Sequence, residues 1–214
     1  HTLQVKGAND TTFDNISLLG LAGTNAYDSG NAGAGINFNG KYNTGGNFTT
    51  LAQISGIKED TNNGTYDGAL TFGVRNDAEG VNIERVRIDS SGRLLVGTSN
   101  PINTSPSKFQ VAATDATGSA ILARFNASVY SSYLDFYKSR NNTLGGVTVV
   151  NNNDHLGALR FYGADGSNSG YTTAAEIYGT CDGGSGGSGD MPGRITFHTR
   201  PDGAGQSMQE RLRI

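Results

Sequence analysis

The sequence predicts an all-β protein made of two tandem homologous modules of short antiparallel strands. Three observations support this. Gly supplies 32 of the 214 residues and charged residues only 16%, a composition that disfavours a helical bundle. Apolar and polar residues alternate in short runs separated by Gly, Asn and Asp, which is typical of half-buried strands joined by turns. Finally, long segments of the chain repeat each other.

The repeat indicates duplicated modules of domain size. Residues 35–56 align without a gap with residues 158–179. G-A-L-T-F and E-R-V-R-I follow the first segment, and G-R-I-T-F and E-R-L-R-I follow the second in the same order. A period this long is typical of repeated domains rather than of solenoids. The repeat-defining residues are Phe38, Phe72, Glu84 and Arg85 in the first module and Phe161, Phe197, Glu210 and Arg211 in the second.

We expect the modules to span residues 1–100 and 107–214, with a Pro-containing join between them. After E-R-V-R-I the first module continues through D-S-S-G into R-L-L-V, which predicts a hairpin. The second module stops directly after E-R-L-R-I, so it looks truncated at its C-terminal end. We therefore expect the parent polypeptide to continue beyond Ile214.

The repeated runs are expected to be strands with one apolar face. Leu70, Phe72 and Val74 alternate with Thr and Gly, and Ile195 and Phe197 alternate in the same way. In the two E-R-x-R-I runs the arginines alternate with aliphatic residues, which predicts a cationic face that meets solvent or a partner's carboxylates. Further candidate strands are Ala120–Phe125, Tyr133–Tyr137, Val147–Val150 and Leu156–Tyr162.

A chain with only 35% hydrophobic residues and about ten short strands has few ways to bury enough surface by itself. Cys181 is the single cysteine, so no intrachain disulfide can form. Oligomerisation remains as the source of further burial, and three chains intertwined about an axis would cover exposed strand edges. In that case Phe72 and Phe197 would face the axis or a neighbouring chain. A monomeric β-sandwich is the competing solution.

The pattern G-x-I-T-F … Q-E-R-L-R-I, together with D-S-S-G-R-L-L-V-G-T, resembles segments of bacteriophage tail fibres and other virion fibre proteins, notably of phages that infect cyanobacteria and marine bacteria. Residues 68–101 carry the most specific part, and residues 192–214 repeat most of it. The resemblance implies an elongated, intertwined homotrimer in an extracellular virion appendage, with other fibre and tail proteins as partners. It brings no catalytic motif with it.

No catalytic, metal or cofactor site is expected. The three histidines form no His-x-x-x-His or Cys/His cluster, and no G-x-S-x-G elbow occurs. Most carboxylates lie beside Asn and Gly in turn-like segments. Residues 60–67 place oxygen-bearing side chains at alternate positions, but they lack the terminal Glu of an EF-hand loop. An ordinary turn is therefore preferred there over a calcium site.

Two kinds of binding site remain as hypotheses. Tyr130, Tyr133 and Tyr137 belong to an aromatic cluster that could stack on a host-surface glycan, although an interchain core is the preferred interpretation. Glu84 beside Arg85, and Glu210 beside Arg211, are interpreted as members of interstrand or interchain ion pairs on a solvated face rather than as an anion- or glycan-binding site. The pI near 5.5 argues against nucleic-acid binding, and no apolar run is long enough to span a membrane.

The leading hypothesis is a non-enzymatic structural and adhesive segment of a phage tail fibre or related virion appendage that contributes to host attachment. The alternatives are a carbohydrate-binding β-sandwich module and a glycan depolymerase domain of a tailspike. The former would be monomeric, and the latter would need a pair of carboxylates on a sugar-binding surface.

Overall fold

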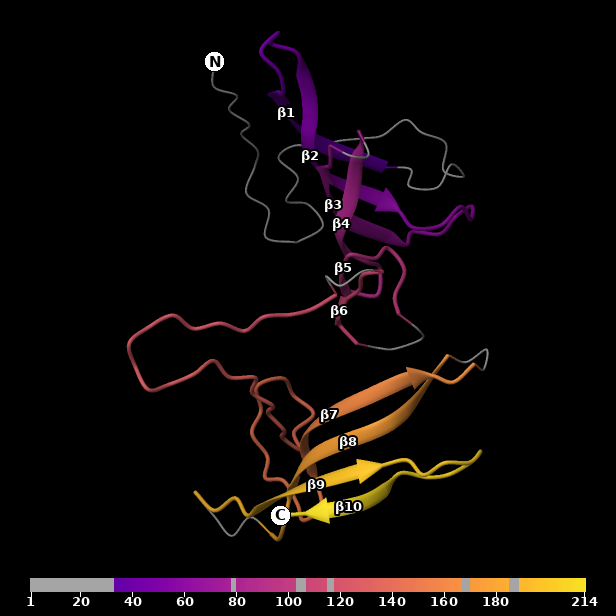
Figure 1. Ribbon diagram of the computed structural model, residues 1–214. Coiled ribbons are helices and arrows are strands. Elements are labelled where there is room, and N and C mark those ends of the chain that lie inside the picture. Colours follow the sequence, from indigo (N-terminus) through magenta and orange to yellow (C-terminus); the bar gives the residue numbers. More distant parts are fainter. Residues whose placement is uncertain (1–32, 78–79, 103–106, 115–117, 167–169, 185–188) are drawn as a thin grey trace. The chain divides into compact units, whose positions relative to one another are not determined.

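The computed structural model describes residues 33–77, 80–102, 107–114, 118–166, 170–184 and 189–214. Within these residues the chain forms ten strands and no helix, which confirms the all-β prediction (Figure 1). The chain divides into two compact units, His1–Ala120 and Ile121–Ile214. Each unit holds one sheet.

The first sheet contains six strands whose spatial order follows the chain. These strands are β1 (Gly33–Lys41), β2 (Phe48–Lys58), β3 (Gly68–Arg75), β4 (Asn82–Ile88), β5 (Leu94–Val96) and β6 (Phe109–Val111). Neighbours from β1 to β5 are antiparallel, and β6 joins β5 in parallel. The D-S-S-G run makes the expected turn between β4 and β5. There the Asp89 carboxylate accepts hydrogen bonds from the backbone N and Nε of Arg93, and Gly92 has a φ of 68°.

The second sheet contains four antiparallel strands in the order β10-β9-β8-β7. These are β7 (His155–Ala164), β8 (Tyr171–Cys181), β9 (Gly193–Thr199) and β10 (Gln209–Arg213). The candidate strand Leu156–Tyr162 lies inside β7, and the runs that end at Phe197 and Ile214 form β9 and β10. Ile214 extends the ladder through two backbone hydrogen bonds with Ile195.

Strands β1–β4 and β7–β10 share one pairing register. Ile54 lies opposite Phe72 in the first sheet, and Ile177 lies opposite Phe197 in the second. Both sheets also carry the same two β-bulges. One directly follows Phe38 in β1 and Phe161 in β7, and the other skips Arg85 in β4 and Arg211 in β10. The repeat-defining residues therefore occupy equivalent strands and equivalent positions along them.

Residues 118–150, here called the arm, do not form the strands that were expected from the sequence. Three candidate strands were expected there, yet none of these residues belongs to a strand. The reason is that a strand needs a hydrogen-bonded neighbour, and within the described residues the arm has only local backbone bonds such as that from Arg140 N to Thr148 O. Strand β6, which falls within the predicted second module, pairs with β5 and lies in the first sheet.

Candidate functional site

The apolar face of the first sheet is largely uncovered in the single chain. One row of apolar side chains crosses four strands: Ile36, Ile54, Phe72 and Val86. Phe38 on the edge strand is 51% exposed, and Leu70, Ile88 and Phe109 on this face are also exposed. Exposed apolar surface on this scale is typical of an interaction surface.

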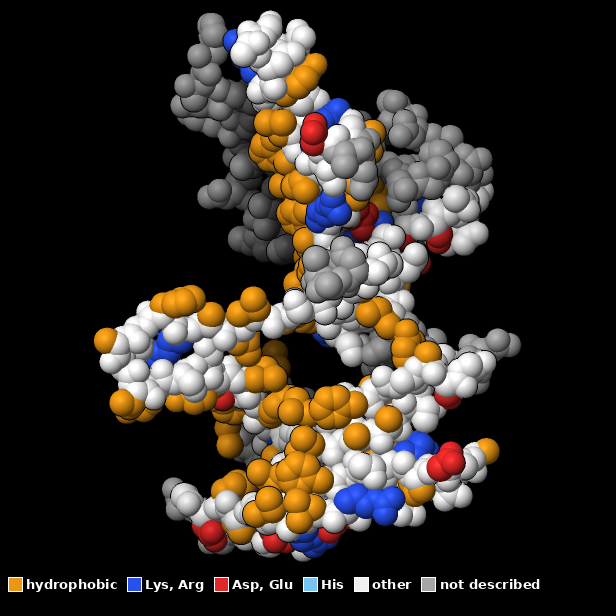
Figure 2. Space-filling model, viewed as in Figure 1, with side chains coloured by type: hydrophobic (Ala, Val, Ile, Leu, Met, Phe, Trp, Pro, Cys, Tyr) orange, Lys and Arg blue, Asp and Glu red, His pale blue; other side chains and the backbone are white. Residues whose placement is uncertain are grey.

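The second sheet repeats this arrangement. Its equivalent row contains Leu159, Ile177, Phe197 and Leu212. Phe161 is 54% exposed, and Figure 2 shows apolar side chains gathered over this sheet. Phe136 of the arm reaches the sheet at Gly157, where a Cβ atom would come within 2.6 Å of the Phe136 ring. A hollow of about 450 Å³ remains between this part of the arm and strands β7–β9.

The opposite, polar faces contain the more deeply buried side chains. Ser55 and Thr71 in the first sheet, and Thr180 and Thr196 in the second, are all buried. Water-soluble monomers normally show the reverse distribution, with apolar side chains inside. The apolar face of the first sheet is therefore largely uncovered, and that of the second is covered only in part, by Phe136 and its neighbours in the arm.

Glu84 and Glu210 each pair with an arginine of their own strand, whereas interstrand or interchain ion pairs were expected. Arg87, not Arg85, binds Glu84, through Nε–Oε1 and Nη2–Oε2 distances of 2.7 and 2.8 Å. Arg213, not Arg211, binds Glu210 in the same bidentate way. The bulge at the intervening arginine explains the change, because one extra residue brings positions i and i+3 to the same face of the strand.

The two equivalent clamps lie in different surroundings. Arg87 is 8% exposed and also donates to Glu59, whose second oxygen accepts from the Ser90 backbone. Its hydrogen bonds to Glu84 raise the pKa of the guanidinium. The Arg213 side chain is 53% exposed. Arg87 therefore binds carboxylates of its own chain, contrary to the expected cationic face that meets solvent or a partner.

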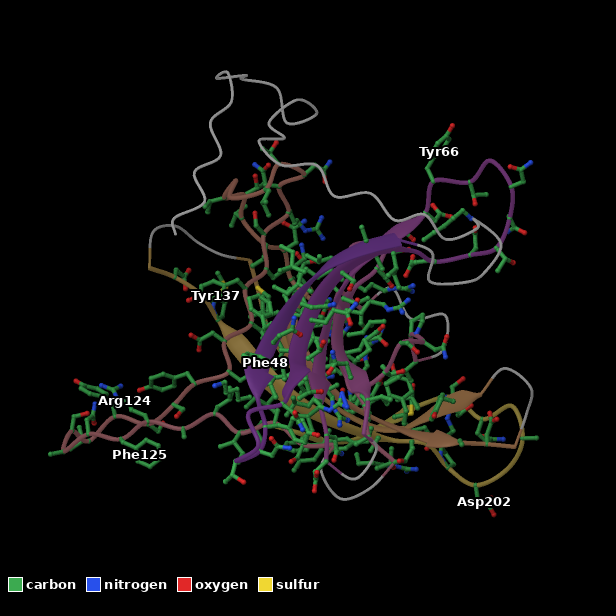
Figure 3. All side chains as sticks on the ribbon, turned by 90° about the horizontal axis from the view of Figure 1, so that it is seen from above. Phe48, Tyr66, Arg124, Phe125, Tyr137 and Asp202 are labelled. Carbon is green, nitrogen blue, oxygen red and sulfur yellow. The ribbon has the colours of Figure 1, made fainter. Side chains whose placement is uncertain are left out.

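The tyrosines proposed as glycan contacts all lie on the arm. Tyr130, Tyr133 and Tyr137 are exposed, the last by 92%. The Arg124 guanidinium lies 5.8 Å from the centre of the Tyr130 ring, a cation–π distance. Figure 3 shows Phe125 at the outer end of the arm, away from Tyr137. The three tyrosines are thus available for contact, with either a glycan or another chain.

The oxygen-rich loop between β2 and β3 is organised around a lysine. Lys58 Nζ donates to the backbone oxygens of Asp60 and Asn62 at 2.9 and 2.8 Å, to Thr65 Oγ1 at 2.9 Å, and to Asp60 Oδ1. Hydrogen bonds from Lys58 and Thr65 lower the pKa of Asp60 to about 2. Tyr66 extends from this loop into solvent (Figure 3). The ammonium group of Lys58 thus binds oxygens of the segment that was the candidate calcium loop.

Removing this ammonium group should be visible in the ionisation of Asp60. In Lys58→Met, the pKa of Asp60 is expected to rise from about 2 towards the usual aspartate value near 4, because its strongest donor is lost. Since the folded-state pKa is the lower one, the loop contact stabilises the protein above pH 4 and weakens as the pH falls towards 2. An NMR titration of the Asp60 carboxyl carbon measures this. Lys41→Met should leave it unchanged, and an unchanged Asp60 pKa in Lys58→Met would contradict the assignment.

Sequence reasoning missed a cluster on the polar face of the second sheet. The Tyr178 ring lies 4.3 Å from the ring of His155 and 5.5 Å from that of His198. Arg160 donates to the Tyr178 hydroxyl and forms an ion pair with Glu176 at 3.3 Å. Burial is the main cause that raises the pKa of Tyr178. The repeat alignment held a signal for this cluster, because Tyr178 aligns with Ser55 of the first module.

Comparison with known proteins finds similarity at the level of structure. No model of a protein family and no curated protein sequence matches the chain. Among solved structures, the carboxy-terminal domain of the bacteriophage T5 L-shaped tail fibre matches with a TM-score of 0.63 and 12% identity, over 97% of this chain and 87% of that domain. The chain has the fold of a phage tail-fibre domain.

A second structure of that tail-fibre domain, with its intramolecular chaperone domain, matches equally well, and this chain covers 60% of it. The tail-fibre fold agrees with the resemblance found in the sequence. The narrower resemblance, to fibres of phages that infect cyanobacteria and marine bacteria, stays a prediction. In the described part of the tail-fibre-like chain, no helix is long and apolar enough to cross a membrane, and no three His, Cys, Asp or Glu residues are grouped to hold a metal ion.

Proposed function

We propose that this chain is a structural and adhesive, non-enzymatic segment of a phage tail fibre or related virion appendage, and that it acts as an elongated homotrimer. Other fibre and tail proteins would join it at its ends, and a host-surface glycan would be its external ligand. The observation that carries the proposal is the incompletely covered apolar face on each sheet of a chain with a tail-fibre fold.

The apolar faces support self-assembly because they are equivalent in the two units. Phe38 and Phe161 occupy the same register position and are exposed to a similar degree. A symmetric assembly that covers one of these faces can therefore cover the other with the same contacts. We infer that the two units are copies of one module and that stacking them lengthens a shaft without a new type of interface.

The arm supports intertwining of the chains. Its apolar side chains, including those of Ile121, Phe125, Val129 and Val147, are exposed. An extended segment with unpaired backbone groups can add a strand to the edge of another chain's sheet. In a trimer the arm would thus gain the strand partner that it lacks among the described residues of its own chain.

The molar mass in solution tests the proposal. Size-exclusion chromatography with light scattering is expected to give about three times the chain mass of 22.3 kDa, at all concentrations where the protein is folded. A folded monomer would contradict the trimer and favour a carbohydrate-binding module. Incubation of the same sample with host envelope polysaccharide should release no oligosaccharides, whereas sustained release would favour a depolymerase.

A further inference from the structure

The polar face of the first sheet carries a hollow of about 270 Å³ across β2, β3 and β4. Its lining is mostly polar and comes from Gln53, Ser55, Ile57, Thr71, Gly73, Asn82 and Glu84. Ser55 and Thr71 are its most deeply buried members, and Ser55 is 6% exposed. Ligand sites for drug-sized molecules usually start near 300 Å³, so this hollow suits a compact ligand such as a single sugar ring.

The hollow exists because the first sheet has small residues where the second has large ones. Ser55 lies opposite Thr71, and its equivalent Tyr178 lies opposite Thr196. Gly73 lies between Gln53 and Glu84, and its equivalent His198 lies between Glu176 and Glu210. In the second sheet the rings of Tyr178 and His198 contact each other over this area. The same place on the polar face is therefore a hollow in the first sheet and is filled by side chains in the second.

The lining chemistry selects a neutral ligand rich in hydroxyl groups. Asn82 Oδ1 is buried and has no hydrogen-bond partner, so it can accept a bond from a ligand donor. Both Glu84 oxygens already accept from Arg87, so the carboxylate that lines the hollow has a cationic partner within the protein. The same carboxylate disfavours an anionic ligand. Gln53 Nε2 donates to Ser55 Oγ, and Thr71 Oγ1 donates to the Ser55 backbone oxygen. The oxygens of these side chains still have acceptor capacity for the hydroxyl groups of a ligand.

We propose that this hollow binds one neutral sugar unit of a surface glycan, with Asn82 Oδ1 accepting a hydrogen bond from a sugar hydroxyl. The inference rests on the proposed attachment function and names the site and the ligand class for it. This site is distinct from the arm tyrosines, which lie in the other unit.

Saturation-transfer NMR on the full chain in its assembled form tests this site. The probes are glucose, galactose, mannose and N-acetylglucosamine, each added as the free monosaccharide. At least one is expected to bind with a Kd of about 1 mM, a usual strength for so small a ligand. Ser55→Tyr should abolish this binding, because the ring copies the filling that Tyr178 provides in the second sheet.

Asn82→Ala is the second variant. It is needed because Ser55→Tyr could lose sugar binding through misfolding rather than through filling of the hollow. Removing an unpaired buried acceptor should cost the fold little, yet it should weaken sugar binding about tenfold. Asn37→Ala, on the same face but outside the hollow, and Tyr137→Ala, on the arm, should both bind as the wild type does.

Two results would overturn the inference. One is an assembled wild-type protein that binds none of the four sugars. The other is sugar binding that survives both Ser55→Tyr and Asn82→Ala, or that is lost in Tyr137→Ala instead. Light scattering on the same samples keeps the two proposals apart, since a trimer without sugar binding would contradict only the site, whereas a monomer would contradict the proposed function.

Discussion

The double variant Phe38→Asp and Phe161→Asp is expected to lose trimeric assembly. Both side chains are about half exposed in the single chain, so a carboxylate there is tolerated before assembly. In an apolar interface each carboxylate would be buried without a partner, at a cost of several kcal/mol per site. Three chains would each contribute two such sites. Light scattering across a dilution series should show monomers or disordered aggregates in place of a trimer.

Asn37→Asp is the matched control for this experiment. Asn37 precedes Phe38 on the same strand and lies on the opposite face of the sheet. Asn37→Asp adds one negative charge per chain, against two in the double variant, and the assembly should remain trimeric. If the double variant kept the wild-type mass, the apolar faces would not be the surfaces that hold the chains together.

Arg87→Ala is expected to destabilise the first unit far more than Arg213→Ala destabilises the second. Arg87 is almost fully buried and neutralises Glu84 and Glu59. Its removal leaves two carboxylates without their cation in a poorly solvated place, which should cost about 3 kcal/mol. Arg213 makes the same bidentate contact in solvent, where such pairs contribute little. Urea unfolding at one fixed protein concentration measures the difference.

Arg87→Lys separates charge from geometry in this test. A lysine keeps the positive charge but cannot form the planar bidentate bond, so it should recover only part of the lost stability. Equal losses in Arg87→Ala and Arg213→Ala would show that the burial of Arg87 has no energetic consequence, contrary to our expectation.

The strands of the two sheets could be predicted because each has its partner in the same chain. The alternation in Leu70-Thr71-Phe72 and in Ile195-Thr196-Phe197 correctly placed β3 and β9. The same kind of pattern failed in the arm at Ala120–Phe125 and Tyr133–Tyr137. Alternation reports which residues would share a face, but not whether a neighbouring strand exists in the chain. A segment with no strand partner among the described residues therefore looks like an ordinary strand in the sequence.

The charged residues illustrate a different limit. Period two placed Arg85 and Arg87 on one face, but a bulge removes Arg85 from the ladder and brings Arg87 beside Glu84. A single inserted position inverts the faces of every residue beyond it, and E-R-V-R-I contains no Gly or Pro to mark it. The hollow around Ser55 was equally hidden, since it depends on which small residues meet across three strands.

The unusual distribution of burial also concerns how the molecule reaches its folded state. A sheet that leaves its apolar face open buries less apolar surface to offset the entropy of ordering its backbone. If three chains must meet before that face is covered, folding becomes a reaction of higher order in concentration, and newly made chains compete with aggregation until they meet. Once assembled, such a trimer would persist for a time that is set by its activation barrier to unfolding. Its endurance outside the cell would then be set by a rate of unfolding rather than by an equilibrium constant.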